Sequence, residues 1–338
     1  MQNKPQILPE GYKSKLSLIE TELAIKLVKD TFERQLAASL NLIRVSAPLF
    51  VRPSTGLNDN LSGIERPVGF DVLDLDEEVQ IVQSLAKWKR MALHRYGFEN
   101  GRGLYTDMNA IRRDETLDCL HSVYVDQWDW ELIIDRQDRN PAFLQKIVRK
   151  IMAALYHTQT LLCQSFPALG PILSEEAVTF LSSQELEDIY PDLTPFEREC
   201  AITKKYGAVF LSQIGASLRS GKPHDGRAPD YDDWSLNGDI LVWNPVLGRA
   251  FEISSMGIRV DEASLAAQLK ISGCENRRDM PYHKLLLEGK LPLTVGGGIG
   301  QSRICMLMLH KAHIGEVQVS EWPSDVLEEC AAQGVVLL

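Results

Sequence analysis

The chain has 338 residues, of which 44% are hydrophobic and 24% are charged, and it carries a net charge of −10 at pH 7. This acidic balance disfavours general binding to nucleic acid or to an anionic membrane, although a few local arginines can still hold a small anionic ligand. No apolar run approaches the roughly 20 residues of a membrane span, and the six cysteines show no CxxC pairing, which favours reduced thiols in a cytoplasmic protein.

The first half of the chain alternates between helical and strand-like patterns. Apolar spacing predicts a helix over residues 15–40, and it is followed by a strand over 42–51 and a turn-rich loop over 52–63. The later patterns predict a short strand pair at 68–73 and 79–82 and a helix at 85–96. Two strands at 104–112 and 121–134 follow, and then a long helix at 141–165 that covers the sheet.

Strands in the second half tend to follow one another directly. The expected elements are helices at 185–193, 197–205, 264–269 and 282–288, and strands at 208–214, 239–243 and 249–255. This order favours an α+β fold with a mixed, mainly antiparallel sheet flanked by helices over a doubly wound parallel sheet. We see no internal repeat or low-complexity linker, so we expect a single catalytic domain spanning residues 1–338.

A glycine-rich stretch, Gly296–Arg303, directly precedes an apolar run with helical character. Glycines let a ligand approach the backbone, and a helix N-terminus presents unpaired N–H groups to phosphate. A dinucleotide-binding glycine cluster opens the first βαβ unit and needs further parallel strands, but only a short segment follows Arg303. The stretch also lacks the GK[ST] of a P-loop. We therefore predict a nucleotide site of another kind.

The strand predicted at 121–134 separates its side chains by alternation. One face carries valines and then Gln127, Asp129 and Glu131, whereas the opposite face carries Tyr124, Asp126, Trp128 and Trp130. The first face is typical of a sheet surface that passes from the core into a pocket. Taken alone, it is explained more readily by a half-exposed strand with a solvated end.

Four charged segments have both a functional and a simpler interpretation. Arg112 and Arg113 could bind a polyphosphate through bidentate guanidinium contacts, or they could belong to a surface charge run. A lysine of segment 83–90 could point into a pocket, or both of its lysines could be solvated. The acidic segment 227–234 could bind Mg²⁺, a substrate amine or a ribose, or form only a loop. Asp239 and Glu252 lie on adjacent predicted strands and could share Mg²⁺ with phosphate oxygens.

Together these segments resemble the catalytic core of the class II aminoacyl-tRNA synthetases. Residues 112–131 resemble the second signature motif of that class, Gly296–Arg303 resembles the third, and residues 83–89 are similar to the aspartate-recognising segment of the aspartyl enzymes. A closer resemblance, to the ammonia-dependent aspartate–ammonia ligases, runs from about residue 15 to the end of the chain. It is carried by segments 59–63, 84–90, 121–131, 227–234, 236–245, 254–259 and 296–303. One departure is that only Ser235 separates Trp234 from Leu236, which shortens a loop of that family.

The resemblance to aspartate–ammonia ligases implies a reaction and its reactants. The β-carboxylate of L-aspartate attacks the α-phosphate of ATP, giving β-aspartyl-AMP and pyrophosphate, and ammonia then displaces AMP to give L-asparagine. It further implies Mg²⁺ as a cofactor and a homodimer formed through the N-terminal helix and the strand after it. We expect no nucleic-acid partner and no membrane association.

The resemblance also assigns roles to individual residues. The ATP-binding set comprises Arg112 at the α-phosphate (or Arg113 if the register is shifted), Arg303 at adenine and the γ-phosphate, Asp239 and Glu252 at Mg²⁺, and Ser255, Gly298 and Gly300 nearby. The amino-acid set comprises Asp59, Ser84, Lys89, Gln127 and Asp129, with Arg227 and Asp232 closing the pocket. Lys89 would pair with a substrate carboxylate and Asp59 with its ammonium group. The expected catalytic residues are Arg112, Gln127, Lys89, Asp59 and Arg303.

Two alternatives share this core. A synthetase-like enzyme could transfer an amino acid to tRNA or to a protein, but the acidic net charge argues against tRNA. An inactive paralogue could only sense amino acid or nucleotide, but the intact arginines, carboxylates and glycines argue against loss of chemistry.

Overall fold

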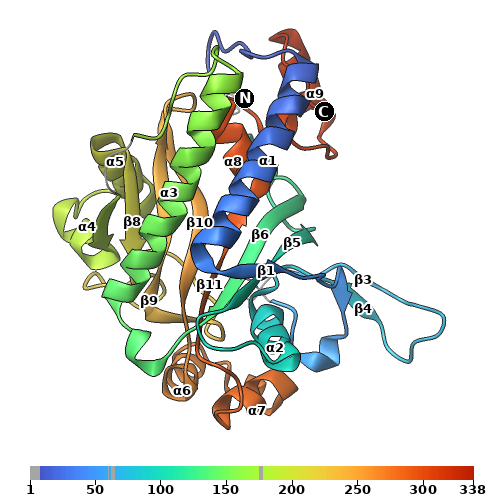
Figure 1. Ribbon diagram of the computed structural model, residues 1–338, viewed down its shortest axis with the longest axis vertical. Coiled ribbons are helices and arrows are strands. Elements are labelled where there is room, and N and C mark those ends of the chain that lie inside the picture. The colour runs from blue at the N-terminus through green and yellow to red at the C-terminus, as the bar shows by residue number, and fades with distance from the viewer. Residues whose placement is uncertain (1–7, 60, 62–64, 175–177) are drawn as a thin grey trace.

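The computed structural model describes residues 8–59, 61, 65–174 and 178–338. Its centre is an eight-stranded sheet with the order β1-β5-β6-β11-β10-β9-β8-β7 (Figure 1). The outermost pairs, β1 with β5 and β7 with β8, are parallel, and the five pairs between them are antiparallel. The predicted α+β class with a mixed, mainly antiparallel sheet is therefore confirmed.

The strands of the main sheet, in spatial order, are β1 (Leu42–Arg44), β5 (Gly103–Ile111), β6 (Tyr124–Ile133), β11 (Thr294–Gly300), β10 (Arg249–Arg259), β9 (Asp232–Asn244), β8 (Ala208–Ser212) and β7 (Thr179–Ser182). A second, three-stranded sheet contains β2 (Phe50–Val51), β4 (Val79–Ile81) and β3 (Gly69–Phe70). Its hairpin extends away from the rest of the molecule (Figure 1).

The α-helices are α1 (Leu18–Leu40), α2 (Ala86–Tyr96), α3 (Pro141–Ser165), α4 (Ser183–Ile189), α5 (Pro195–Tyr206), α6 (Glu262–Ile271), α7 (Pro281–Leu287), α8 (Gln301–Met308) and α9 (Ser324–Ala332). Short 3-10 helices lie at Pro53–Thr55, Arg136–Asp138, Glu275–Asp279 and Ile314–Glu316. Within the described ranges, no helix has the length and apolar character needed to cross a membrane.

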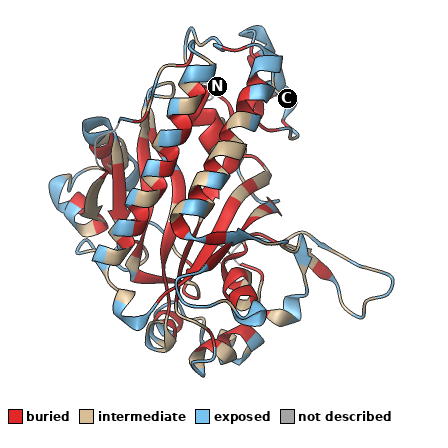
Figure 2. Cartoon of the chain, viewed as in Figure 1, coloured by how far each residue is buried: buried red, intermediate tan, exposed pale blue. Residues whose placement is uncertain are grey.

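Helices α1 and α3 lie side by side on one face of the main sheet (Figure 1). Each begins with a side-chain cap: Ser17 and Glu20 form a capping box on α1, and Asn140 accepts the N–H of Phe143 on α3. The sides of both helices that face the sheet are buried (Figure 2). Phe32 of α1 packs on Trp128 of β6, with ring centroids 4.8 Å apart, and so joins the helix layer to the sheet.

The structure differs from the predicted strands at four places. The strand expected over 42–51 is divided into β1 and β2, which belong to different sheets. β7 was not predicted, and β9 begins seven residues earlier than expected, at Asp232 rather than Asp239. The glycine stretch, for which no strand was predicted, forms the central strand β11, which is hydrogen-bonded to β6 and β10 on its two sides. Sequence patterns do not predict such a strand, because glycine has a low strand propensity. It occurs in a strand mainly where neighbouring groups occupy the space that a side chain would fill.

A wide bulge interrupts β9 near its start. The pairing with β10 jumps from Asn237–Gly257 to Asp232–Arg259, so residues 233–236 stand opposite a single residue of β10. The indole of Trp234 fills the space beside Gly215, where a Cβ would lie only 2.7 Å from the ring, and its N–H donates to the carbonyl of Ala228 at 3.3 Å. The segment expected to be a shortened loop is thus a bulge that supports the preceding connection.

Candidate active site

The polar face of β6 and the glycines of β11 form one surface. Gln127, Asp129 and Glu131 stand directly opposite Gly300, Gly298 and Gly296 in the antiparallel register. The predicted alternation is confirmed, because Trp128 and Trp130 lie in the core on the other face.

The glycines make room for polar side chains. A Cβ on Gly298 would lie 2.5 Å from the side-chain oxygen of Gln127, and one on Gly296 would lie 2.0 Å from a carboxylate oxygen of Glu131. Such contacts are far shorter than van der Waals separation, so any larger residue would displace these groups. The glycines therefore contribute by leaving space across the sheet, and not by forming a flexible phosphate loop.

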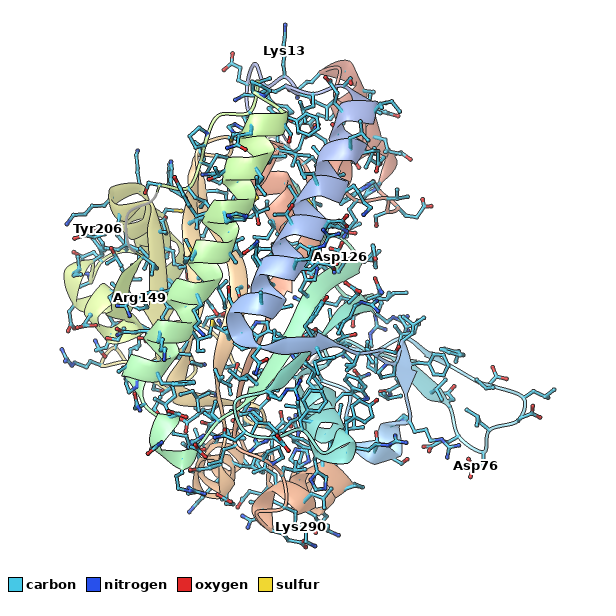
Figure 3. All side chains as sticks on the ribbon, in the orientation of Figure 1. Lys13, Asp76, Asp126, Arg149, Tyr206 and Lys290 are labelled. Carbon is cyan, nitrogen blue, oxygen red and sulfur yellow. The ribbon has the colours of Figure 1, made fainter. Side chains whose placement is uncertain are left out.

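The N-terminus of α8 is already occupied by a carboxylate. Asp126, on the opposite face of β6 from Gln127, accepts the backbone N–H of Ser302 at 3.0 Å. Its other oxygen accepts from Lys29 of α1 at 3.1 Å, and Figure 3 shows Asp126 where β6 runs behind that helix. A carboxylate at this position satisfies a helix N–H and the positive dipole end. The expected role of this helix start as an open phosphate site is therefore not supported at Ser302.

A cavity of about 370 Å³ is lined by the start of β6, the middle of β10 and the end of β11. Eight of the predicted site residues line it: Arg112, Gln127, Arg227, Glu252, Ser255, Gly298, Gly300 and Arg303. Arg112 is half-buried, whereas its neighbour Arg113 is exposed and does not line the cavity. This placement favours Arg112 over Arg113 as the arginine of the second motif.

Arg303 and Arg112 both line the cavity, and neither has a strong partner among the described residues. Arg303 donates to the backbone oxygen of Glu252 at 3.3 Å, and its guanidinium lies 3.7 Å from the carboxylate of that residue. Arg112 makes one long contact, 3.5 Å, with the carbonyl of Gln83, and its buried Nε has no partner among the described residues. Guanidinium groups with unused donors are suited to phosphoryl oxygens.

Asp239 and Arg227 form a buried ion pair at one side of the cavity. Asp239 lies on β9 opposite Ser255 of β10, and its Oδ1 has no hydrogen-bond partner in the described part of the chain. Burial raises the pKa of Asp239 to about 7; Arg227 opposes this increase, whereas the nearby Glu252 adds to it. Across the described ranges, no group of three or more histidine, cysteine, aspartate and glutamate side chains is arranged to hold a metal ion.

The other six predicted residues, Asp59, Ser84, Lys89, Asp129, Asp232 and Asp239, do not line the cavity. Lys89 of α2 is 1% exposed, pairs with Asp129 and donates to the carbonyl of Gly297 at 2.9 Å. Burial lowers the pKa of Lys89, and Asp129 acts against that shift. The structure therefore brings Lys89 and Asp129 together beneath the glycine strand.

Arg259 at the end of β10 joins two acidic residues that lie in the same buried layer. It donates three hydrogen bonds to Glu131, at 2.8, 3.0 and 3.1 Å, and it also pairs with Asp232. Burial alone would lower the pKa of Arg259, but Asp232 and Glu131 raise it well above its usual value. We did not predict Arg259 as a site residue. Its place four residues after Ser255 on a strand could have suggested that it shares a sheet with the site, but sequence gives no sign of its two partners.

A second buried network surrounds Asp230, a further residue that sequence did not single out. Asp230 accepts from Arg277 at 3.0 Å and lies within 3.1 Å of His283 and 3.6 Å of Lys87. Asp59 is also buried, and burial raises its pKa whereas Lys87 lowers it. Ser84, which precedes α2, lowers the pKa of Asp59 in the same direction as Lys87. Lys87 thus lies between the two aspartates.

Comparison with known proteins gives the family. The profile described as "Aspartate-ammonia ligase" (AsnA) matches residues 19–334. The aspartate–ammonia ligase of Clostridium tetani (strain Massachusetts / E88) is 63% identical over 98% of this chain and 97% of its own length. The aspartate–ammonia ligase of Fusobacterium nucleatum is 59% identical over 97% of this chain and 100% of its own length.

Solved structures show the same fold at low sequence identity. The asparaginyl-tRNA synthetase of Pyrococcus horikoshii complexed with asparaginyl-adenylate has a TM-score of 0.65 and 17% identity, over 96% of this chain and 77% of that chain. The aspartyl-tRNA synthetase of Entamoeba histolytica has a TM-score of 0.57 and 15% identity, over 96% and 65% of the two chains. The class II synthetase-like core is thereby confirmed. With near-complete matches to curated relatives at about 60% identity, the chain belongs to the aspartate–ammonia ligase family.

Proposed function

We propose that this protein makes L-asparagine from L-aspartate and ammonia with ATP as the energy source. The family supports this activity, and its relatives carry the name aspartate–ammonia ligase. Within the molecule, the main support for this proposal is that an arginine-lined cavity and a buried layer of ion pairs lie next to each other. A cavity lined by Arg112 and Arg303 adjoins a buried layer of paired charges around Lys89 and Arg259. The first suits a triphosphate and the second a small zwitterion.

In the first step, a β-carboxylate oxygen of aspartate attacks the α-phosphorus of ATP, and the bond to the pyrophosphate oxygen breaks. The chain supplies position and charge, because the bonds that change lie in the substrates. Arg112, which lines the cavity together with Gln127, would bind the α-phosphate. Arg303 would leave its weak contact with Glu252 and bind adenine and the γ-phosphate.

In the second step, the nitrogen of ammonia attacks the β-acyl carbon, and the bond from that carbon to the AMP oxygen breaks. A proton must leave the nitrogen. Within the amino-acid set, Asp59 would hold the substrate ammonium group and Lys89 a carboxylate, with Gln127 and Asp129 beside them. Lys89 now pairs with Asp129, so we propose that the substrate carboxylate shares the lysine with this aspartate. Arg259 would supply a further fixed positive charge, and Arg227 and Asp232 would close the pocket.

We further propose that Asp239 and Glu252 hold Mg²⁺. The donor set fits a hard cation, because it offers carboxylate oxygens, and one of them, Oδ1 of Asp239, is buried with no hydrogen-bond partner among the residues that the structure describes. Ser255 stands across the strand pair from Asp239 and adds a hydroxyl to the same surface. When bound, Mg²⁺ would neutralise charge on the phosphates.

We also propose a homodimer. The first turns of α1 expose Leu18, Ile19 and Leu23 to 48%, 72% and 59%, and Leu49 and Phe50, which follow β1, are exposed as well. Exposed apolar side chains near the N-terminal helix and the strand after it are suited to an interface with a second copy. We also propose a single catalytic domain, which the family match over residues 19–334 supports. The acidic net charge supports the proposal that the protein has no nucleic-acid partner. The six free thiols support a cytoplasmic location. Light scattering of the wild-type protein and of Leu23→Glu tests the dimer, which the charged residue should weaken.

Product analysis tests the activity. The protein is incubated with aspartate, ATP, Mg²⁺ and ammonium, and the products are separated. We expect asparagine, AMP and pyrophosphate in equal amounts. Formation of ADP and phosphate would contradict the adenylating mechanism. Transfer of labelled aspartate to tRNA, without asparagine, would support the synthetase alternative, and no AMP under any condition would support the inactive paralogue.

A further inference from the structure

We propose that Arg227 is an internal counter-ion, which occupies the cation position at Asp239 in the nucleotide-free enzyme and leaves it when a triphosphate offers the guanidinium an anionic partner. The inference rests on the magnesium site proposed above and adds the residue that controls access to it. Arg227 would thus couple metal binding to nucleotide binding.

The position of the guanidinium between cavity and carboxylate is the first observation. Asp239 is 5% exposed and does not line the cavity, whereas Arg227 does. Nη2 of Arg227 pairs with Oδ2 of Asp239, and Oδ1 of the same carboxylate is buried without a hydrogen-bond partner in the described part of the chain. The arginine therefore covers a carboxylate that still has an unused oxygen. This is the state expected of a metal site in which a guanidinium group takes the place of the cation but does not bind every oxygen.

The second observation is that both proposed metal ligands are paired with arginines. Glu252 lies close enough to Asp239 to act on its charge, and its own carboxylate is 3.7 Å from the guanidinium of Arg303. The buried carboxylate of Asp239 needs a compensating cation, and the exposed carboxylate of Glu252 adds to the negative charge beside it. In this structure the arginines supply that charge from opposite sides. A divalent ion could replace their charge at the carboxylates and release both arginines toward the phosphates.

The third observation concerns how Arg227 is held. Among the described residues, its hydrogen-bond and ion-pair partners other than Asp239 lie in its own loop: it pairs with Asp225 and donates to the carbonyl of Gly226 at 2.8 Å. Asp225 is itself 64% exposed. Arg259 differs, because it is fixed between Glu131 and Asp232 and is 3% exposed. Arg227 can therefore move by breaking one buried ion pair, whereas Arg259 cannot move without disrupting the layer beneath the glycines.

The consequence is cooperative binding. Where a competing internal partner occupies a site, the apparent affinity of an external ligand falls in proportion to the fraction of molecules in which the site is open. A triphosphate that binds the guanidinium increases this fraction, because arginine forms strong, bidentate contacts with phosphoryl oxygens. By linkage, the metal must raise the affinity for nucleotide by the same factor as the nucleotide raises that for the metal.

Binding of Mn²⁺ to the nucleotide-free, full-length protein tests the inference without any need for activity. Free Mn²⁺ is measured by electron paramagnetic resonance for the wild-type protein and for Arg227→Met, which keeps most of the side-chain bulk and removes the charge. We expect Arg227→Met to bind Mn²⁺ about tenfold more tightly. Arg219→Met is the matched control, because Arg219 lies in the same connection, is 74% exposed and pairs with Asp188 away from the cavity. It should bind Mn²⁺ as the wild-type protein does.

A double variant locates the effect. Adding Asp239→Asn to Arg227→Met should remove the gain in affinity. An unchanged or weaker affinity in Arg227→Met, or a gain that survives Asp239→Asn, would overturn the inference, even if the wild-type enzyme makes asparagine. Conversely, a gain that needs Asp239 in a protein that makes no asparagine would contradict the proposed function and leave the role of Arg227 standing. Circular dichroism checks folding, and Arg227→Gln provides the same comparison if the methionine variant does not fold.

Discussion

The two halves of the site are built on different electrostatic principles. In the buried half, Lys89, Asp129, Glu131 and Arg259 are nearly excluded from solvent and each has a charged partner. In the open half, Arg303 is 26% exposed in its side chain and its nearest carboxylate, that of Glu252, is 42% exposed. The buried half is therefore organised before any substrate arrives, whereas the open half has weak contacts that a nucleotide can replace.

This difference assigns the two halves different tasks. Fixed charges in a water-poor layer interact strongly and need no rearrangement, so they suit selection of one small amino acid. Arginines with unused donors suit a large anion that must enter and later leave as two products. We expect substitutions in the buried half to cost stability as well as activity, and those in the open half to cost activity alone.

The largest effect is expected for Arg259→Met. This change leaves Glu131 and Asp232 buried without their cation, so it should lower the free energy of unfolding by about 3–5 kcal/mol. Urea denaturation followed by circular dichroism measures the loss. Arg44→Met is the exposed control, since the pair of Arg44 with Asp107, at 2.7 Å, is open to solvent and should contribute less than about 1 kcal/mol. Equal losses in the two variants would contradict the division into buried and open halves.

Arg303→Ala should reduce catalysis by about 10²–10³-fold with little change in stability. The variant removes a phosphate contact and breaks only the weak pair with Glu252. Aspartate-dependent exchange of pyrophosphate into ATP is the appropriate assay, because it reports adenylation alone. Arg113→Ala is the matched control, since Arg113 is exposed and lies outside the cavity. Near-normal exchange in Arg303→Ala would show that the open half does not grip ATP through this residue.

Asp59→Asn should lower kcat/KM for aspartate by about 100-fold while the KM for ATP changes little. The two side chains have nearly the same shape, but the amide cannot compensate a substrate ammonium group, and a charged hydrogen bond in a buried site is worth up to about 3 kcal/mol. Steady-state kinetics with each substrate varied in turn measures the two effects. Parallel losses for aspartate and ATP would instead place Asp59 at a point shared by both halves.

Gly298→Ala should reduce kcat/KM for aspartate by about tenfold. Its Cβ would meet the side-chain oxygen of Gln127 at 2.5 Å, so Gln127 must move within the site, and small displacements of positioning groups are costly. Gly170→Ala is the control, because a Cβ there has no atom within 4 Å and its backbone is not in the left-handed region. If the two variants have equal kinetics, the glycine is not needed as space for Gln127.

Local sequence patterns predicted much of the fold, because in many segments the periodicity of the apolar residues matches the side of the element that is buried. The helix at 141–165 has the predicted bounds of α3, and the alternation on β6 correctly separates Gln127 and Asp129 from Trp128. No strand was predicted over the glycines, because strand propensity reflects the composition of the average strand. In β11, the missing side chains make room for groups from β6, and only the register of the two strands reveals that need.

Pairing between distant residues limited what sequence could say about the site. Lys89 was expected to face a substrate carboxylate, but its partner Asp129 lies forty positions away on another element. Arg259 was missed for the same reason, because neither Glu131 nor Asp232 stands near it in sequence. The residue types needed for the chemistry were visible in the sequence, but their division into a fixed and an open half depends on contacts across the sheet.

The smallest effect is expected in the acid dependence of stability. Burial alone would raise the pKa of Asp230, but Lys87, His283 and Arg277 hold it well below its usual range. An aspartate in the unfolded chain takes up its proton near pH 4, so the stability from Asp230 is complete above that pH and is lost as pH falls further. Asp230→Asn should flatten the decline in unfolding free energy between about pH 5 and 3, by at most about 1.4 kcal/mol per pH unit.

Asp114→Asn separates this effect from that of an exposed pair. The hydrogen bonds from Arg66 lower the pKa of Asp114 to about 2, but both side chains lie at the surface, where salt screens their interaction. Urea denaturation across the same pH range is therefore repeated at low salt and at high salt. Any flattening caused by Asp114→Asn should disappear at high salt, whereas that caused by Asp230→Asn should persist. If high salt also removed the flattening caused by Asp230→Asn, solvent would have to reach the network around Asp230. The contrast between buried and open charges would then not hold for that residue.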